Sequence, residues 1–445
     1  MGETGSCRTG GPPLASVPMR DASRPFWSPR RILAFLIVIN LFSYIDRYVL
    51  IAVEPQIRNA FLAGDPDAMG KSGLLQTAFM VAYLCLAPLF GWLADRTSRW
   101  RLIGLGLLVW STASAGSGLA AGFGLLMATR AFIGAGEAAY GPAAPTLLSD
   151  LFPPDRRGRV LSWFYMAIPV GGALGYAIGG ALGGWLGWRA PFLAVGLPGI
   201  LLAFVCFRLR DPRPPAAPGT HPAPRLSEVV ALARVPSYVI NVMAQTAMTF
   251  AIGGLSYWLP AYITEFRHHG TLREAGLQVG AITVVAGLGA TLGGGWLADR
   301  LRRRLRAPDF VVSASGMLLG FPCCVAMLYL PFPWAWAAIC GAVFFLFFNI
   351  GPANTALANA VPARVRSTAF ALNILFIHLL GDALSPALIG VVADRSDLNH
   401  AFLLVSCAMV VAGVLWLAGC RYLARDTARA AAHDLPIGPP IRAGS

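Results

Sequence analysis

The hydrophobic residues of this chain gather in long runs that shorter polar segments separate. A membrane-spanning helix needs ~20 mainly apolar residues, and twelve runs of about this length occur along the sequence. Their positions are 32–53, 72–94, 102–121, 123–147, 160–184, 190–208, 237–263, 276–298, 309–330, 334–358, 367–392 and 400–422. The pattern predicts an all-α membrane protein with twelve transmembrane helices.

Basic residues are concentrated in every second connection between these runs. Most of the 35 lysine and arginine residues lie in the two terminal segments and in the connections around 96–101, 156–159, 208–234 and 300–306. Cytoplasmic loops of membrane proteins carry an excess of arginine and lysine. The distribution therefore predicts that both termini are cytoplasmic, which agrees with an even number of spans.

The two halves of the chain share a repeated hexapeptide. Gly-Trp-Leu-Ala-Asp-Arg occurs at 91–96 and again, unchanged, at 295–300, each time where an apolar run ends in an arginine-rich turn. The repeat predicts a duplicated six-helix unit, and parallel repeats of this kind form the two halves of major facilitator transporters. We expect five regions, which are an N-terminal tail, a first half, a Pro-rich linker, a second half and a C-terminal tail, at 1–30, 31–208, 209–236, 237–422 and 423–445.

The amino-acid composition indicates that most of the surface of this chain faces lipid. Hydrophobic residues make up 56% of it and charged residues 13%, whereas soluble domains carry ~25% charged residues. The net charge of +14 lies in short runs between apolar segments and not along one folded face, which argues against nucleic-acid binding.

The eight cysteines show no CxxC spacing, so we expect neither a metal site nor a cofactor. A Walker motif and a nucleophile–base set are both missing from the sequence, so we expect neither direct ATP drive nor an enzyme.

Four ionisable residues lie within the first and fourth predicted helices. Ionisable side chains are costly inside a membrane and mark functional sites by default. Arg130 and Glu137 are two helical turns apart, ~10 Å along one face, so each needs a partner on another helix or in a wet cavity. Asp46 and Arg47 are expected to bridge to other helices as well, either in a substrate or proton site or as structural ion pairs.

A histidine and an aspartate share one face of the eleventh predicted helix. His378 and Asp382 are four residues apart and therefore stack, and histidine titrates near neutral pH. The pair is suited to relaying protons, and equally to holding the helix by hydrogen bonds. The sequence leaves both readings open.

The hexapeptide repeat supplies candidate gating residues. Asp95 and Arg96 end the second predicted helix, and Asp299 and Arg300 occupy the same places in the second copy. An aspartate at a helix end can pair with arginines across the interface between the halves and hold one state closed. The alternative is that these residues only fix the topology.

Three segments of the chain resemble the spinster-like branch of the major facilitator superfamily. They are NLFSYIDRY at 40–48, RAFIGAGEAAY at 130–140 and IHLLGDALSP at 377–386. The resemblance covers nearly all of 32–422. It implies export or redistribution of amphiphilic lipids, since animal members move lysophospholipids and sphingosine-1-phosphate.

The resemblance also implies roles for single residues. Asp46 and Glu137 match the positions held to carry protons, and Arg47 and Arg130 match those expected to meet an anionic head group. The same segments supply two aromatic candidates for substrate contact, Tyr44 and Tyr140.

We therefore expect a monomeric, multi-pass transporter of the bacterial inner membrane that works by alternating access. Its expected partners are an amphiphilic anionic lipid or small molecule, protons and the surrounding membrane lipid. Two alternatives stay open, a carrier of a small organic anion or drug with the same fold, and a non-transporting membrane receptor.

Overall fold

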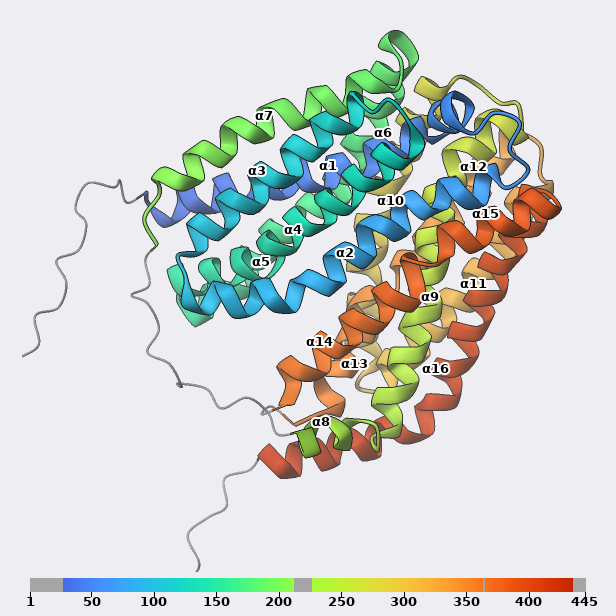
Figure 1. Ribbon diagram of the computed structural model, residues 1–445. Helices are drawn as coiled ribbons and strands as arrows, with labels where there is room; N and C mark the ends of the chain where they lie inside the picture. Colours follow the sequence, from blue (N-terminus) through green and yellow to red (C-terminus); the bar gives the residue numbers. More distant parts are fainter. Residues whose placement is uncertain (1–26, 212–225, 363–364, 435–445) are drawn as a thin grey trace, which may run out of the picture.

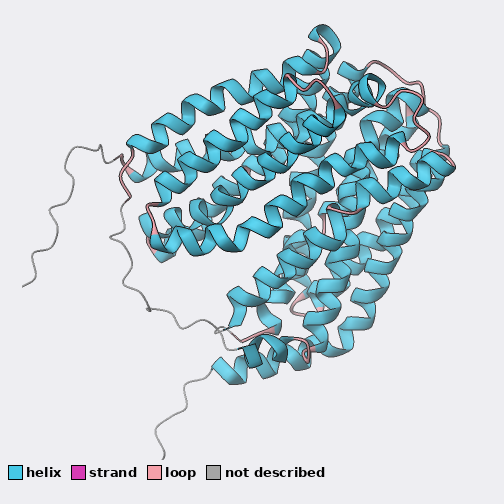
Figure 2. Cartoon of the chain, in the orientation of Figure 1, coloured by secondary structure: helices cyan, strands magenta, loops and turns pink. Residues whose placement is uncertain are grey.

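A computed structural model describes residues 27–211, 226–362 and 365–434 (Figure 1). The described residues form helices joined by short loops, with no strand among them (Figure 2). Ten stretches of the described chain are long and apolar enough to cross a membrane. The other two predicted spans, at 102–121 and 123–147, form the helices α3 and α4, and the count of twelve spans stays a prediction.

Seven helices form the first bundle. In chain order they are α1 (Pro29–Phe61), α2 (Ala68–Arg96), α3 (Arg99–Gly118), α4 (Phe123–Leu151), α5 (Pro154–Tyr165), α6 (Ala167–Leu186) and α7 (Arg189–Arg208). The predicted fifth span, 160–184, is thus divided between α5 and α6. Of the predicted linker, residues 212–225 lie outside the described residues, and 226–232 form the short helix α8 (Leu226–Leu232).

The second bundle contains more interrupted helices than the sequence pattern predicts. Its elements are α9 (Pro236–Ala261), η1 (Tyr262–Phe266), α10 (Leu272–Leu301), α11 (Pro308–Tyr329), α12 (Trp334–Phe347), α13 (Ile350–Ala360), α14 (Arg366–Phe376), η3 (Ile377–Asp382), α15 (Ser385–Arg395) and α16 (Leu398–Asp434). The predicted tenth span is divided into α12 and α13, and the eleventh into α14, the π-helix η3 and α15. The last helix continues to Asp434, into the segment predicted as a tail.

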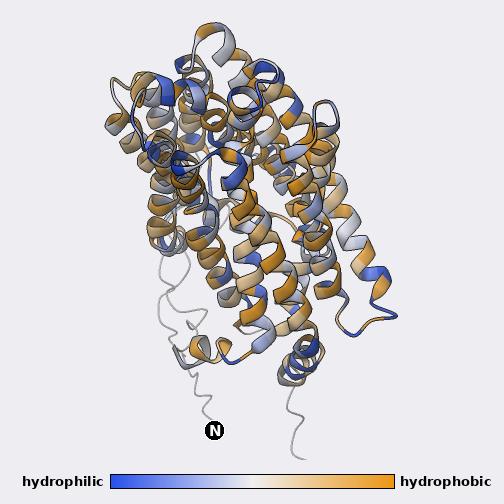
Figure 3. Cartoon of the chain, turned by 90° about the vertical axis from the view of Figure 1, so that its right-hand side faces the viewer, coloured by the Kyte–Doolittle hydropathy of each residue, from blue (hydrophilic) through white to orange (hydrophobic). Residues whose placement is uncertain are grey.

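Side chains at the helix ends explain where several of these helices begin. Proline occupies the first position of α1, α9 and α11, where its missing N–H has no helical partner to lose. Thr271 and Glu274 form a capping box at the start of α10, which satisfies two of the free N–H groups there. Hydrophobic residues dominate the long helices, and hydrophilic residues gather toward loops and helix ends (Figure 3).

Small residues let α6 pack closely against α1. A Cβ atom added to Gly171, Gly175 or Gly179 would lie 2.6 Å from a Cβ atom of α1. Helix pairs in membranes approach closely through such small residues, so these glycines serve the packing of α6 on α1. The contact fixes the side of α1 from which its polar residues project.

The two bundles meet near one end of the molecule and diverge toward the other (Figure 1). The meeting end holds the α1–α2 loop and the start of α10, and α6 contacts α10 there while α2 contacts α15. The diverging end holds the start of α1, the end of α16 and α8. Following the arginine distribution, we call the diverging end the cytoplasmic side and the meeting end the outer side.

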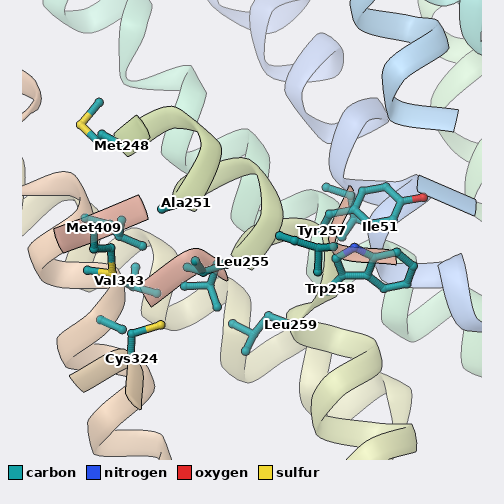
Figure 4. Packing of buried hydrophobic residues seen from close by; sticks show 14 of the residues in the cluster. Ile51, Met248, Ala251, Leu255, Tyr257, Trp258, Leu259, Cys324, Val343 and Met409 are labelled. Carbon is teal, nitrogen blue, oxygen red and sulfur yellow. The ribbon is translucent and has the colours of Figure 1, made fainter. Parts of the chain in front are cut away.

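Buried side chains of α9 join the two bundles into one apolar core. Leu255 and Leu259 lie toward Cys324 in the second bundle, while Tyr257 lies beside Ile51 of α1 (Figure 4). Ile51 is 7% exposed, and the three α9 residues are 2% exposed or less. Because α9 packs against both bundles, its buried side chains separate the space between the halves from the outer side.

Candidate transport site and gates

Two crossed ion pairs join α1 to α4. Arg130 Nη1 lies 3.4 Å from Asp46 Oδ2, and neither side chain is exposed to solvent. Ser114 of α3 also donates a hydrogen bond to the Asp46 carboxylate. Two further nitrogens of Arg130 are buried without a hydrogen-bond partner among the described residues. This pair is therefore deep in the first bundle and closed to direct contact with a solute.

The second pair joins Arg47 to Glu137. Arg47 Nε and Nη2 both donate to Glu137 Oε2, at 2.8 and 2.5 Å. The rings of Tyr44, Phe79 and Tyr83 surround the guanidinium, with centroids 5.0, 4.8 and 5.7 Å from its central carbon. The Arg47 side chain is 17% exposed and the Glu137 side chain 1%. Arg47 is thus the accessible member of the pair.

The second bundle contributes a histidine–aspartate pair from η3. His378 Nδ1 lies 3.0 Å from both carboxylate oxygens of Asp382. The two side chains are 29% and 18% exposed, so water or a solute can reach them. Single π-helical turns inside α-helices are frequent at functional sites, and here the turn carries both polar residues.

A cavity of about 210 Å³ lies between the halves and brings some of these residues together. The residues that line it come from α1, α2, α6, α9 and η3, and they are Tyr44, Arg47, Tyr48, Ile51, Gln76, Met80, Ile168, Gly253, Ser256, Tyr257, His378 and Asp382. Four predicted site residues thus face one space, with the cation of α1 in one wall and the His–Asp pair in another. Asp46, Arg130 and Glu137 lie behind this wall.

Tyr140 is placed away from the cavity. Its hydroxyl donates to the carbonyl of Leu36 at 2.8 Å, and its ring packs edge-on against Trp110. The side chain is 4% exposed. We therefore assign Tyr140 to holding α4 against α1 and do not carry it into the binding proposal.

An aspartate of the second bundle closes the outer side by capping a helix of the first. Asp394 accepts hydrogen bonds from the backbone N–H groups of Met69 and Gly70, at 3.0 and 2.7 Å. These groups begin α2, where N–H donors lack helical partners. Gly390 allows the close approach, since a Cβ atom there would lie 2.4 Å from the Met69 carbonyl oxygen.

Asp394 was not among the residues predicted from the sequence, although a signal for it exists. Residues 390–395 read Gly-Val-Val-Ala-Asp-Arg, which keeps the Gly-x-x-Ala-Asp-Arg frame of the hexapeptide repeat. This third copy ends α15 on the outer side, so the same local sequence ends a helix on each side of the molecule.

A partly buried ion network also crosses between the halves on the outer side. Arg58 of α1 pairs with Glu54 at 3.0 Å and with Glu265 of η1. Ser72 donates to Glu54 at 2.6 Å, and the Tyr257 hydroxyl donates to the Ser72 carbonyl at 2.8 Å. Glu54 was not selected from the sequence as a site residue, and the contact that makes this network cross between the halves, Arg58 with Glu265, joins residues 207 positions apart.

The predicted gating residues on the cytoplasmic side, where their side chains are described, contact residues of their own half. Arg96 stacks on Trp92 at 4.2 Å, and the side chain of Asp95 lies outside the described residues. Asp299 is 78% exposed and reaches Arg302 at 3.3 Å, while Arg300 lies over Trp296. A gating role for these four residues stays a prediction for a state in which the cytoplasmic side is closed.

The fold and the site define a multi-pass membrane transporter. Two helical bundles enclose a charged cavity, and contacts between the halves close the outer side of that cavity. The comparisons with known proteins agree with this class. The chain matches the family described as Major Facilitator Superfamily over residues 36–386. It is 36% identical to human protein spinster homolog 1 over 449 residues, covering 90% of this chain and 82% of the relative.

Other relatives point the same way. Zebrafish protein spinster homolog 3 is 33% identical, with 91% of this chain and 87% of the relative covered. Among solved structures, a bacterial homolog to the human lysosomal transporter spinster, inward-facing and unoccupied, has a TM-score of 0.73 at 21% identity, with 92% and 99% of the two chains covered. A D-xylose–proton symporter has a TM-score of 0.70 at 18% identity, with 86% and 96% covered.

The chain belongs to the Major Facilitator Superfamily and, within it, to the spinster family of transporters. It is therefore a transporter and not an enzyme. The bundles of this chain diverge on the side that the arginine distribution predicts to be cytoplasmic (Figure 1).

Proposed function

We propose that this transporter moves an anionic amphiphile of the lysophospholipid or sphingosine-phosphate kind by proton-coupled alternating access. The observation that carries the proposal is the position of Arg47, which is the one lysine or arginine among the described residues that line the central cavity. The family resemblance supports the lipid class, and the cavity geometry supports an anionic head group.

An anionic head group binds Arg47 by replacing its present partner. Arginine presents a planar fork of donors that suits phosphate and carboxylate groups, and both donors now meet one oxygen of Glu137. Aromatic rings around the guanidinium hold it in place, since cations are attracted to ring faces. A phosphate that enters the cavity therefore competes with Glu137 for the same fork.

Loss of this partner couples binding to a proton. Glu137 is buried, and its other oxygen already lacks a hydrogen-bond partner among the described residues. An unpaired buried carboxylate is costly, and protonation removes the cost. Substrate binding at Arg47 therefore favours proton uptake at Glu137. The Asp46–Arg130 pair is less accessible and serves as a second candidate, with His378 and Asp382 as a third on the opposite wall.

The size of the cavity limits what it encloses. Pockets for drug-sized ligands usually measure ~300–1,000 Å³, and this cavity measures about 210 Å³. It suits a phosphate head group with the adjoining atoms, near the apolar side chains of Ile51, Met80 and Ile168. The acyl tail of a lysolipid extends beyond it, toward the side where the halves diverge.

The contacts on the outer side define the step that completes transport. Opening that side requires release of Asp394 from α2 and of Arg58 from Glu265, and closing the cytoplasmic side brings the turns at 95–96 and 299–300 toward the opposite half. Rocking of the two halves around a central site is the usual movement of this superfamily.

The small cavity also favours a second candidate function, transport of a small organic anion that fits inside it completely. Thermal unfolding of the purified protein with a ligand panel separates the two. Lysophospholipids raise the unfolding temperature of wild type but not of Arg47→Ala if the first proposal holds. Stabilisation by short carboxylates or sugar phosphates alone, with lysolipids inert, overturns it in favour of the second.

A further inference from the structure

An apolar groove runs along the surface of the second bundle and shares no lining residue with the central cavity. Its volume is about 720 Å³, and its walls come from α9, α14–η3, α16 and the end of α8. Two hydroxyls line it and both are engaged, since Tyr238 donates to the Ala369 carbonyl at 3.0 Å and Thr246 to the Val242 carbonyl at 2.8 Å. The groove therefore offers a ligand only apolar contacts.

The position of the groove matches one leaflet of a bilayer. Its α9 residues run from Tyr238 to Phe250, a stretch of ~18 Å at the helical rise, and a hydrocarbon core is ~30 Å thick. Met243 and Val411 in its walls are 53% and 51% exposed, so the groove faces outward. Because Leu232 of α8 contributes to it, the groove lies in the cytoplasmic half of the second bundle.

Arginines gather just beyond the cytoplasmic end of this groove. Tyr422 follows Leu415 of the groove by two turns of α16, so the two share a face. The guanidinium carbons of Arg421 and Arg425 lie 4.7 and 5.4 Å from the centroid of the Tyr422 ring. Arg234, directly after α8, is exposed on the neighbouring segment. The rim is thus cationic where the groove is apolar.

The acidic groups near this rim leave it with a positive charge. Asp426 is buried and accepts from the backbone N–H of Ser237 at 3.0 Å and from Arg425 Nε at 3.1 Å. Glu228 of α8 is a second nearby carboxylate in the sequence. Arg421, Arg425, Arg429 and Arg234 outnumber these two, and all four are exposed.

We propose that an anionic phospholipid of the cytoplasmic leaflet binds here as a structural lipid, with an acyl chain in the groove and its phosphate on Arg421 and Arg425. Charge complementarity selects the ligand, because clusters of arginine at the cytoplasmic interface attract anionic lipids. Tyr422 adds an aromatic side chain of the type enriched at that interface. The lipid would connect α8, α9 and α16 at the point where the linker enters the second bundle.

This site differs from the substrate site of the proposed function. Phe250 and Leu380 line the groove, whereas Gly253, His378 and Asp382 line the cavity. The same helices thus present one face to the groove and another to the cavity. Binding at the groove does not depend on which substrate the transporter carries.

Native mass spectrometry of the full-length protein in detergent tests the proposal with phosphatidylglycerol and phosphatidylcholine that have the same acyl chains. Wild type is expected to bind phosphatidylglycerol more tightly. The double variant Arg421→Ala/Arg425→Ala is expected to lose about 25-fold in that affinity, since each interfacial arginine contributes roughly a fivefold preference. The matched control Arg303→Ala/Arg304→Ala, in another exposed cytoplasmic turn, should bind like wild type.

A second variant tests the groove itself. Val411→Trp places a large side chain into it from an exposed position and is expected to lower occupancy by both lipids. Equal affinity of wild type for the two lipids, or equal loss in the double variant and its control, overturns the head-group site. Unchanged occupancy in Val411→Trp overturns the placement of the acyl chain.

Discussion

Replacing Asp394 with alanine removes the carboxylate that joins α15 to the first turn of α2. Two backbone N–H groups lose their acceptor, at 3.0 and 2.7 Å in the present structure. Loss of an aspartate at the start of a helix typically costs 0.5–2 kcal/mol. In an outer-open state the same N–H groups face water, so the loss falls only on the closed state. We expect a shift of about 1–2 kcal/mol, which multiplies the ratio of outer-open to outer-closed molecules by about 5–30.

Spin-label distance measurements across the outer side detect this shift. Labels at Ala63→Cys, in the loop before α2, and Trp334→Cys, at the start of α12, report the separation of the halves once the native cysteines are replaced. Asp394→Ala should add a long-distance population, and Asp394→Asn should add less because it keeps one acceptor.

The matched control for this experiment is Asp397→Ala. Asp397 lies three residues further on, in the loop between α15 and α16, and accepts its hydrogen bonds from His400, within its own half. Its removal should leave the distances of the outer side unchanged. Distances that stay the same in Asp394→Ala, or that change equally in the control, would refute the role of Asp394 in closing the outer side.

Three further predictions follow from packing and hydrogen bonding. Arg47→Lys keeps the charge but loses the fork that grips Glu137, so KM for an anionic substrate should rise about tenfold or more in uptake assays. Gly294→Ala should lower the free energy of unfolding by about 1–3 kcal/mol through overpacking, since its Cβ atom would lie 1.7 Å from the carbonyl oxygen of Phe348, whereas Gly289→Ala meets nothing within 4 Å and should leave stability unchanged. Tyr140→Phe should cost about 1 kcal/mol of stability and leave KM unchanged, and a raised KM would return Tyr140 to the binding site.

Much of the fold was predictable because helix periodicity and membrane thickness constrain the sequence strongly. The apolar runs, the duplicated hexapeptide and the need of Arg130 and Glu137 for partners all follow from local pattern. The structure supplies those partners from two adjacent residues, Asp46 and Arg47 of α1. Their crossed pairing was not predictable, since it depends on the rotation of α1 against α4.

The breaks in the second bundle and the outer contacts depend on tertiary structure. A pattern with a period of 3.6 residues does not reveal where η3 interrupts the eleventh span. The spacing therefore predicted that His378 and Asp382 form a pair, but not that the pair faces the central cavity while Leu380 lines a groove. Asp394 finds its partners more than 300 residues away. The third copy of the repeat can be recognised as a contact between the halves only once it is known that α15 lies against α2.

Uptake of a labelled lysophospholipid into proteoliposomes tests the central claim most directly. Wild type and Glu137→Gln are compared with and without a proton gradient across the membrane, and Tyr140→Phe serves as a variant outside the cavity. The account predicts uptake that the gradient stimulates in wild type and in Tyr140→Phe, with the stimulation lost in Glu137→Gln. Equal stimulation of Glu137→Gln, or no lysophospholipid uptake by wild type while a small organic anion is carried, would contradict it.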